Sequence, residues 1–124
     1  FDNRNHAGEF LEQAGLRYQF DFPDTIPDKK LSGEQRRNIY LVIKEGLHNV
    51  VKHAQASQVR IEVVLNEKLT VTIRDNGKGI SNEKPAGFGN GLKNMRQRME
   101  SVGGRFEISN DRGTLIRLFV PLLG

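Results

Sequence analysis

Two strand–turn–strand patterns constrain the fold of this chain more than any other feature. Residues 58–65 and 69–73 alternate apolar with polar side chains around a short turn at 66–68, and residues 106–109 and 114–120 do the same around 110–113. Strands so close in sequence pair as antiparallel hairpins. Parallel neighbours would need a crossover of a dozen or more residues, so the patterns favour a mixed, mostly antiparallel sheet over a doubly wound one.

Helical patterns separate these strands. Ser32 and Gln35 form a capping box, and the helix that it opens is predicted to run to about Ala54. Its expected core stripe is Ile39, Tyr40, Ile43, Leu47, Val50 and Val51. Residues 16–22 form a further alternating strand, residues 91–102 a second helix, and residues 1–15 a helical or irregular segment. The order predicts an α+β, two-layer sandwich with its helices on one face of the sheet.

Composition narrows the classes of function. The 124 residues have the size of one domain, and the absence of cysteine excludes disulfides and thiolate metal sites. No apolar run approaches the roughly 18 residues of a membrane span, and no signal peptide opens the chain. The net charge of +4 suits an anionic ligand or an acidic partner. Nucleic acid is disfavoured because the basic residues are scattered and no helix has a basic recognition face.

A polar face on the long helix is the first candidate site. Glu45, Asn49, Lys52 and His53 share one arc of the helix, away from the predicted core stripe. An amide oxygen suits Mg²⁺, which prefers oxygen ligands and substrate phosphates, and a lysine suits a phosphate as a point charge. The alternative is an ordinary solvated helix face, because such neighbours are common on helices.

The second candidate is Asp75, which follows an apolar strand and begins the segment Asp75-Asn76-Gly77-Lys78-Gly79-Ile80. A buried carboxylate discriminates strongly in favour of a hydrogen-bond donor such as the adenine amino group. Gly77 and Gly79 would let the backbone approach a flat base closely. The alternative is a plain strand-ending turn, for which Asp, Asn and Gly are the usual residues.

Two glycine motifs complete the set of candidates. Gly87-Phe88-Gly89-Asn90-Gly91-Leu92 precedes a helix, where exposed N–H groups and the positive end of the helix dipole suit phosphates. A flexible surface loop explains the same composition. Gly113 precedes Thr114, whose hydroxyl could bond Asp75 or a bridging water, although strand propensity explains a threonine there equally well.

Taken in order, these segments resemble the motifs of the histidine kinase, gyrase, chaperone and mismatch-repair ATPase superfamily. Residues 45–54 resemble its N-box, residues 75–80 its first glycine box, residues 89–92 its second and residues 113–114 its third. Residues 90–99 also resemble the Gly-Leu-x-x-Met-x-x-Arg signature of sensor kinases of the nitrate/nitrite-sensor and lipid-fluidity-sensor type. The resemblance covers about residues 16–121 and implies a Bergerat-type ATP-binding fold with a flexible ATP lid at 77–91.

The resemblance also implies roles for single residues. Asp75 would bond the adenine amino group with help from Gly79 and Thr114, and Asn49 would bind the Mg²⁺ that bridges the phosphates of ATP. Glu45 would act as a base or would orient the attacking nucleophile. The other expected phosphate or nucleotide contacts are Lys52, His53, Gly77, Ile80, Gly89, Gly91 and Leu92.

The phosphoacceptor of such a kinase is not recognisable in this sequence. The family transfers the γ-phosphoryl group to a histidine beside an acidic residue on a separate dimerisation domain, whereas His6 precedes Ala7 and Gly8. We therefore expect residues 1–124 to be a single histidine kinase-like ATPase domain, with residues 1–15 as a candidate remnant of the joining segment. Alone it should be monomeric and at most weakly active.

The resemblance further implies partners and a location. The expected partners are ATP, the dimerisation and phosphoacceptor domain of the parent kinase and, downstream, a response regulator. The domain is expected in the cytoplasm, whether or not the parent is anchored in a membrane. The alternative function is an anti-sigma-factor-type serine kinase or binding module, which shares the fold; an ATP-driven machine of the gyrase branch needs transducer domains for which the chain has no room.

Overall fold

A five-stranded sheet organises the structure, which is a computed structural model describing residues 4–23, 30–53, 56–77, 91–110 and 112–123. The strands are β1 (Arg17–Asp21), β2 (Gln58–Leu65), β3 (Lys68–Asp75), β4 (Arg105–Asn110) and β5 (Thr114–Pro121). Their order in the sheet is β1-β2-β3-β5-β4. Only the β1–β2 pair is parallel among them, so the predicted mixed, mostly antiparallel sheet is confirmed.

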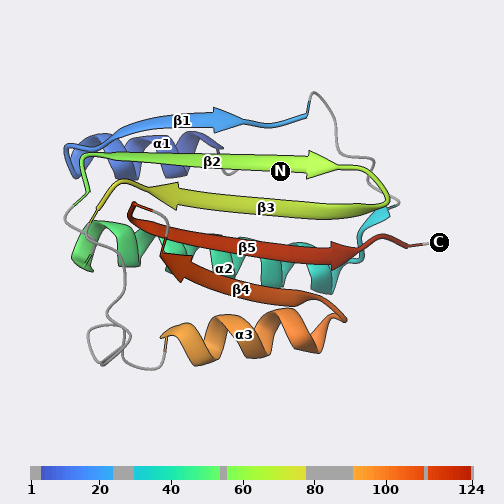
Figure 1. Ribbon diagram of the computed structural model, residues 1–124. Helices are drawn as coiled ribbons and strands as arrows, with labels where there is room; N and C mark the ends of the chain where they lie inside the picture. Colours follow the sequence, from blue (N-terminus) through green and yellow to red (C-terminus); the bar gives the residue numbers. More distant parts are fainter. Residues whose placement is uncertain (1–3, 24–29, 54–55, 78–90, 111, 124) are drawn as a thin grey trace.

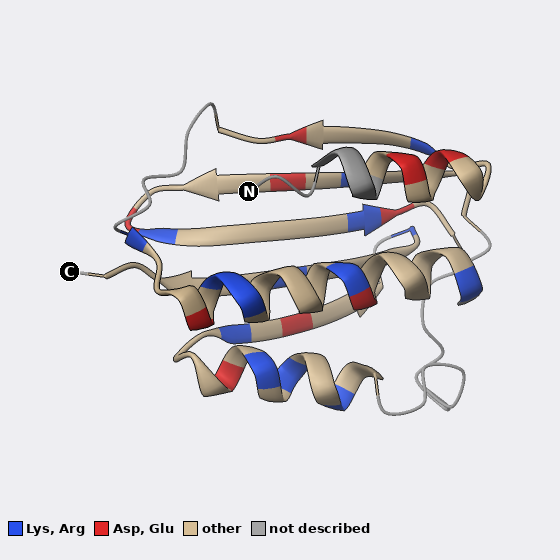
Figure 2. Ribbon diagram, turned by 180° about the vertical axis from the view of Figure 1, so that it is seen from behind, with Lys and Arg blue, Asp and Glu red and all other residues tan. Residues whose placement is uncertain are grey.

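The helices form the second layer of the sandwich. They are α1 (Arg4–Gln13), α2 (Gly33–His53) and α3 (Gly91–Ser101), and all three lie on the same side of the sheet. Figure 1 views the sheet from its uncovered side, and Figure 2 shows the helices from behind. The predicted α+β two-layer sandwich is therefore confirmed, whereas the predicted lid falls almost wholly on residues outside the described ranges. No helix in those ranges is both long and apolar enough to cross a membrane.

Local sequence signals explain where the helices begin and end. The Ser32 hydroxyl accepts a hydrogen bond from the amide of Gln35 at 3.0 Å, and the Gln35 carboxamide accepts one from the amide of Ser32 at 2.9 Å. This reciprocal pair satisfies two N–H groups that a helix start otherwise leaves unbonded. The α3 helix ends at Ser101, and Gly103 just beyond it adopts a φ of +76°, a conformation that glycine reaches without strain.

The hydrophobic core lies between the sheet and the helices. Alternate residues of each strand face the helices, as Leu69, Val71 and Ile73 do in β3, and all three are buried. The predicted stripe of α2 needs correction, since Val51 is 36% exposed, Tyr40 is half-buried and outside the core cluster, and Val42, which was not predicted, is fully buried. The helix turns about 100° per residue, so Val42 shares the buried side with Ile39, whereas Val51 lies one position beyond Val50 and turns outward.

Several strand ends differ from the prediction by one or two residues: β1 is one residue shorter at each end, β3 begins one residue earlier at Lys68, and β4 is one residue longer at each end. β3 continues past Ile73 to Asp75, which pairs with Val59, and β5 includes Pro121. The Asn76 side chain explains the longer β3: its Oδ1 accepts hydrogen bonds from the amides of Ser57 and Gln58, both at 3.0 Å. These bonds hold the end of β3 against the start of β2, so the pairing of the two strands extends two residues beyond the end that the apolar pattern indicates.

Candidate functional site

Asp75 lies buried at the end of β3, with 3% of its surface exposed. Its Oδ1 accepts a hydrogen bond from the amide of Gly77 at 2.8 Å and another from the amide of Thr114 at 3.1 Å. The two N–H donors give one oxygen of this buried carboxylate the hydrogen bonds that it cannot receive from water. They also fix its orientation. Within the described part of the chain no hydrogen bond reaches Oδ2, so this oxygen remains able to accept one from a ligand.

Gly113 makes the contact between β5 and Asp75 possible. Its φ is +139°, and a Cβ at this position would overlap the carbonyl group of Asp75 and lie 3.0 Å from Oδ1. Only glycine permits both the conformation and the close approach. Thr114 is buried, and it reaches Asp75 through its backbone amide. The sequence had suggested its hydroxyl, for which the structure records no bond to Asp75.

Asn49 presents a different kind of buried polar group. The residue is 6% exposed, and its Nδ2 is the one buried side-chain nitrogen or oxygen without a hydrogen-bond partner among the residues that the structure describes. Leaving such a group unbonded costs about 1–3 kcal/mol. Native structures rarely tolerate that cost without a functional reason, which makes this amide a candidate for binding a ligand.

The start of α3 packs against the part of α2 that carries Asn49. A Cβ at Gly91 would lie 2.5 Å from Oε1 of Glu45 and 3.7 Å from Nδ2 of Asn49. The missing side chain at position 91 therefore lets the first turn of α3 approach both residues. The N–H groups of a helix start have no intrahelical acceptors and favour anions, so an amide, a carboxylate and a helix N-terminus converge here.

Gly46 joins this cluster to the strand that carries Asp75. A Cβ at Gly46 would lie 3.2 Å from Cδ1 of Ile73 and 3.5 Å from Cδ1 of Ile116, so α2 packs closely on β3 and β5 at this point. Gly46 follows Glu45, and Ile73 lies two residues before Asp75. The end of β3, the start of β5, the last turns of α2 and the start of α3 accordingly meet at one end of the molecule, on the left in Figure 1.

The other sequence-predicted residues lie as follows. Lys52 is exposed in the last turn of α2, and Leu92 is half-buried and packs against the core. His53 is the last residue of α2, but its side chain lies outside the description. The predicted contacts at Gly79, Ile80 and Gly89 lie outside the described residues. The structure thus brings Glu45, Asn49 and Gly91 into one cluster and Asp75, Gly77 and Thr114 into another.

Sequence reasoning missed two residues that position the site. Asn76 was included in a motif without a role, yet its Oδ1 ties the end of β3 to the start of β2, and its Nδ2 donates to the Ser57 hydroxyl at 3.0 Å. Gly46 lies within residues 45–54 and was likewise given no role of its own. An asparagine directly after a strand is a signal for such a bond; the need for a glycine at position 46 becomes visible only when α2 is packed on the sheet.

The donor set fits a metal held mainly by a substrate. Among the described residues there is no group of three or more histidine, cysteine, aspartate or glutamate side chains that could hold a metal ion. Mg²⁺ commonly binds through one or two protein oxygens together with waters and substrate phosphates. The unbonded Nδ2 of Asn49 is a hydrogen-bond donor that suits a phosphate oxygen, and a metal ion would be held by the oxygen of the same carboxamide.

Comparison with known proteins agrees with this geometry. A family model described as "Histidine kinase-, DNA gyrase B-, and HSP90-like ATPase" matches residues 34–124. The chain belongs to this family. The match contains both clusters described above and omits α1 and β1, so the candidate site lies wholly within the family's domain.

Sequence relatives place the chain among the ATPase domains of sensor histidine kinases. It is 36% identical over 113 residues to the signal transduction histidine-protein kinase/phosphatase UhpB of Salmonella typhimurium, covering 90% of this chain and 22% of UhpB. It is 34% identical over 123 residues to the oxygen sensor histidine kinase NreB of Staphylococcus carnosus, covering 96% and 35%. The chain therefore spans about a third or less of the length of these relatives.

Solved structures show the same fold at lower sequence identity. The histidine kinase AdeS of Acinetobacter baumannii superposes with a TM-score of 0.75 at 20% identity, over 97% of this chain and 61% of that one. Full-length ShkA in complex with AMPPNP superposes with a TM-score of 0.77 at 15% identity, over 95% and 29%. These structures show the fold, and the family match together with the sequence relatives identifies the chain as a histidine kinase-type, ATP-binding domain.

Proposed function

We propose that this domain binds Mg-ATP in the site between α2, α3 and the end of β3 and transfers the γ-phosphoryl group to a histidine on a separate dimerisation domain. The observation that carries the proposal is the state of Asp75: buried, with Oδ1 held by two backbone amides and Oδ2 without a bond in the described structure. A carboxylate so oriented accepts a hydrogen bond from an exocyclic amine, which adenine offers at position 6 and guanine does not.

The second cluster supplies the phosphate end of the proposed site. The Asn49 carboxamide oxygen would ligate Mg²⁺, and Lys52 and the N–H groups at the start of α3 would face phosphate oxygens. When bound, Mg²⁺ neutralises charge on the phosphates, which is most of what phosphoryl transfer requires of a protein besides positioning. His53, Gly79, Ile80, Gly89 and Leu92 remain predicted contacts.

Glu45 is the proposed group that faces the nucleophile. Its carboxylate is half-buried and lies against the start of α3 beside Asn49. In the proposed reaction an imidazole nitrogen attacks the γ-phosphorus, a phosphorus–nitrogen bond forms, and the bond to the β,γ-bridging oxygen breaks to release ADP. Glu45 would orient the imidazole and accept the proton from its other nitrogen.

The dimerisation domain, the response regulator and the monomeric state of the fragment are part of the same proposal. This is because the chain spans only about a third or less of the length of the sensor kinases to which it is similar. The relatives compared are sensor histidine kinases, and no observation favours the serine-kinase alternative. Single-domain organisation over residues 1–124 likewise remains a prediction.

The test is a calorimetric titration of the wild-type chain and Asp75→Asn with Mg-ATP and Mg-GTP. The substitution turns an acceptor into a group that also presents donors, so ATP affinity should fall by about 10- to 150-fold, or about 1.5–3 kcal/mol. Glu100→Gln removes one negative charge from the exposed side of α3 and should leave the affinity unchanged. Equal ATP affinities for wild type and Asp75→Asn, or equal binding of ATP and GTP by wild type, would overturn the adenine assignment.

A further inference from the structure

The β2–β3 ladder ends in a pair that is bonded differently from a regular pair of strand residues. The register joins Val59 to Asp75 at the end of β3, and one position further Gln58 faces Asn76. Residues in a hydrogen-bonded antiparallel pair normally exchange two backbone N–H···O=C bonds. Here the Asn76 amide donates to the Gln58 carbonyl at 3.2 Å, but the Gln58 amide donates to the side-chain Oδ1 of Asn76 at 3.0 Å. The carboxamide thus takes the place of the Asn76 backbone carbonyl.

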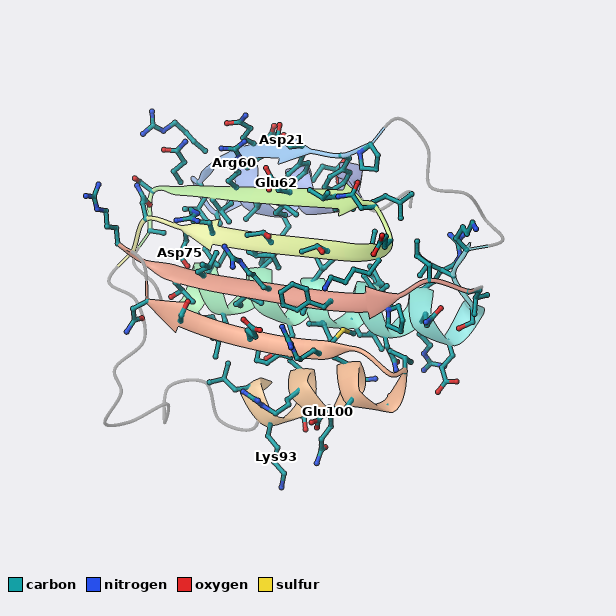
Figure 3. All side chains as sticks on the ribbon, turned by 45° about the vertical axis from the view of Figure 1, so that its right-hand side comes forward. Asp21, Arg60, Glu62, Asp75, Lys93 and Glu100 are labelled. Atoms are coloured by element: carbon teal, nitrogen blue, oxygen red, sulfur yellow. The ribbon has the colours of Figure 1, made fainter. Side chains whose placement is uncertain are left out.

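This replacement lets the backbone bend at the point where the proposed nucleotide site needs a turn. The Gly77 amide donates to Oδ1 of Asp75 at 2.8 Å. Such a bond, from a side chain to the amide two residues on, forms in a turn and not in an extended strand. If the backbone carbonyl at position 76 bonded Gln58, the strand would continue and would hold the Gly77 amide away from Asp75. Asp75 itself lies at this end of β3 (Figure 3).

Ser57 fixes the carboxamide of Asn76 in one orientation. Its amide is the second donor to Oδ1, at 3.0 Å, and its hydroxyl accepts a hydrogen bond from Nδ2 at 3.0 Å. Two backbone donors can face only the oxygen of a carboxamide, so the amide cannot be turned over. The Ser57 carbonyl in turn accepts a 3.0 Å bond from the amide of Arg17, the first residue of β1. Asn76 is therefore fastened to a segment that the sheet already holds.

The burial of these groups separates their effect on the site from their effect on the fold. Asn76 and Ser57 are exposed, so water can replace much of what their hydrogen bonds contribute to stability. Asp75 is buried, and its Oδ1 has no such replacement for the Gly77 amide. Loss of the side chain at position 76 should accordingly disturb the orientation of the carboxylate more than it destabilises the domain.

We infer that Asn76 and Ser57 are positioning residues for adenine recognition. They hold the Gly77 amide on Oδ1 of Asp75, so that Oδ2 faces the exocyclic amine of the base. Both act through Gly77 and Asp75, and neither side chain is required to touch the nucleotide. The inference rests on the proposed function, because the amine belongs to the proposed ATP.

The first measurement needs no nucleotide. Hydrogen exchange of the Gly77 amide is followed by NMR on the full, ¹⁵N-labelled chain. Asn76→Ala should speed this exchange by about threefold to tenfold, since the amide loses its acceptor. Asn66→Ala removes the same carboxamide from the exposed turn at the other end of the β2–β3 hairpin and should leave the exchange of Gly77 unchanged.

The second measurement is calorimetric titration with Mg-ATP. Asn76→Ala should lower the affinity by about threefold to tenfold. In the Asp75→Asn background the same substitution should have no further effect, because it acts through Asp75. Asn76→Asp keeps an acceptor for both backbone amides and should retain most of the wild-type affinity. Ser57→Ala should cause a smaller loss in the same direction, and it serves as the second variant if Asn76→Ala does not fold.

Three results would overturn the positioning role. One is wild-type exchange of the Gly77 amide in Asn76→Ala. Another is an equal loss of ATP affinity from Asn76→Ala with and without Asp75→Asn, which would mean that the effect bypasses Asp75. The third is a loss in Asn76→Asp as large as that in Asn76→Ala. A wild-type chain that fails to bind Mg-ATP would remove the proposed function, whereas the hold on Asp75 is still decided by the exchange of Gly77.

Discussion

The amide of Thr114 donates a 3.1 Å hydrogen bond to Oδ1 of Asp75, from the first residue of β5 to the last residue of β3. The two residues are 39 positions apart in the sequence. The bond exists because Gly113 brings the β5 backbone over Asp75 at a φ that other residues rarely adopt. The orientation of the proposed adenine acceptor is therefore set by a glycine that has no side chain with which to contact a ligand.

Gly113→Ala should damage stability and nucleotide binding together. The added Cβ would overlap the Asp75 carbonyl group, and the alanine would have to adopt a strained φ. We therefore expect a loss of about 2–3 kcal/mol in the free energy of unfolding. Urea denaturation measures this loss, and calorimetry should show weaker ATP binding. Gly33→Ala, where a Cβ meets no atom within 4 Å at the start of α2, is the matched control and should be neutral or stabilising. Wild-type stability in Gly113→Ala would show that the strand ends adjust freely.

Gly91→Ala should act through Glu45. A Cβ at position 91 would meet Oε1 at the far end of a flexible side chain, so the fold should survive while Glu45 is displaced. In a double-mutant cycle with Glu45→Ala, the stability effect of Gly91→Ala should differ by about 0.5–1.5 kcal/mol between the two backgrounds. Thermal or urea unfolding of the four proteins gives this coupling. Strict additivity would show that the start of α3 does not press on Glu45 in solution.

Asn49→Leu should separate stability from ligand binding. The nearly equal-sized apolar side chain removes a buried amide with an unbonded nitrogen, so the nucleotide-free domain should be as stable as wild type or about 1 kcal/mol more stable. Binding of ATP should lose its dependence on Mg²⁺, measured by calorimetry with and without the metal. If Asn49→Leu retains the wild-type response to Mg²⁺, the assignment of Asn49 as the metal ligand fails.

The fold was predictable from the sequence because its signals are local. Hairpin alternation, the Ser32–Gln35 capping box and the glycines after α3 each act over a few residues, and each appears in the structure where the sequence indicates it. One exception is instructive: Val51 lies next to the buried Val50 and was predicted in the core, yet the sheet covers only the side of α2 that bears Ile39 and Val42.

The site was less predictable, since its geometry depends on contacts between distant segments. Residue types and order were enough to suggest Asp75 and Asn49 together. They could not show that the Thr114 contact runs through the backbone, that Gly91 lies against Glu45, or that Asn76 closes the β2–β3 ladder. The grouping of Arg60, Arg74 and Arg117 around one pocket on the uncovered face of the sheet was not predictable for the same reason, because the three become neighbours only through strand register.

The close packing of α2 on the sheet at Gly46 has a consequence for selectivity. With only a hydrogen atom on that side of the helix, the backbone near Glu45 and Asn49 rests directly on Ile73 and Ile116, and little room remains for α2 to slide relative to β3. Asp75 at one end of the proposed site and Asn49 at the other are thus held at a fixed separation. A ligand is then measured by its length between base and phosphates as well as by its chemistry at each end.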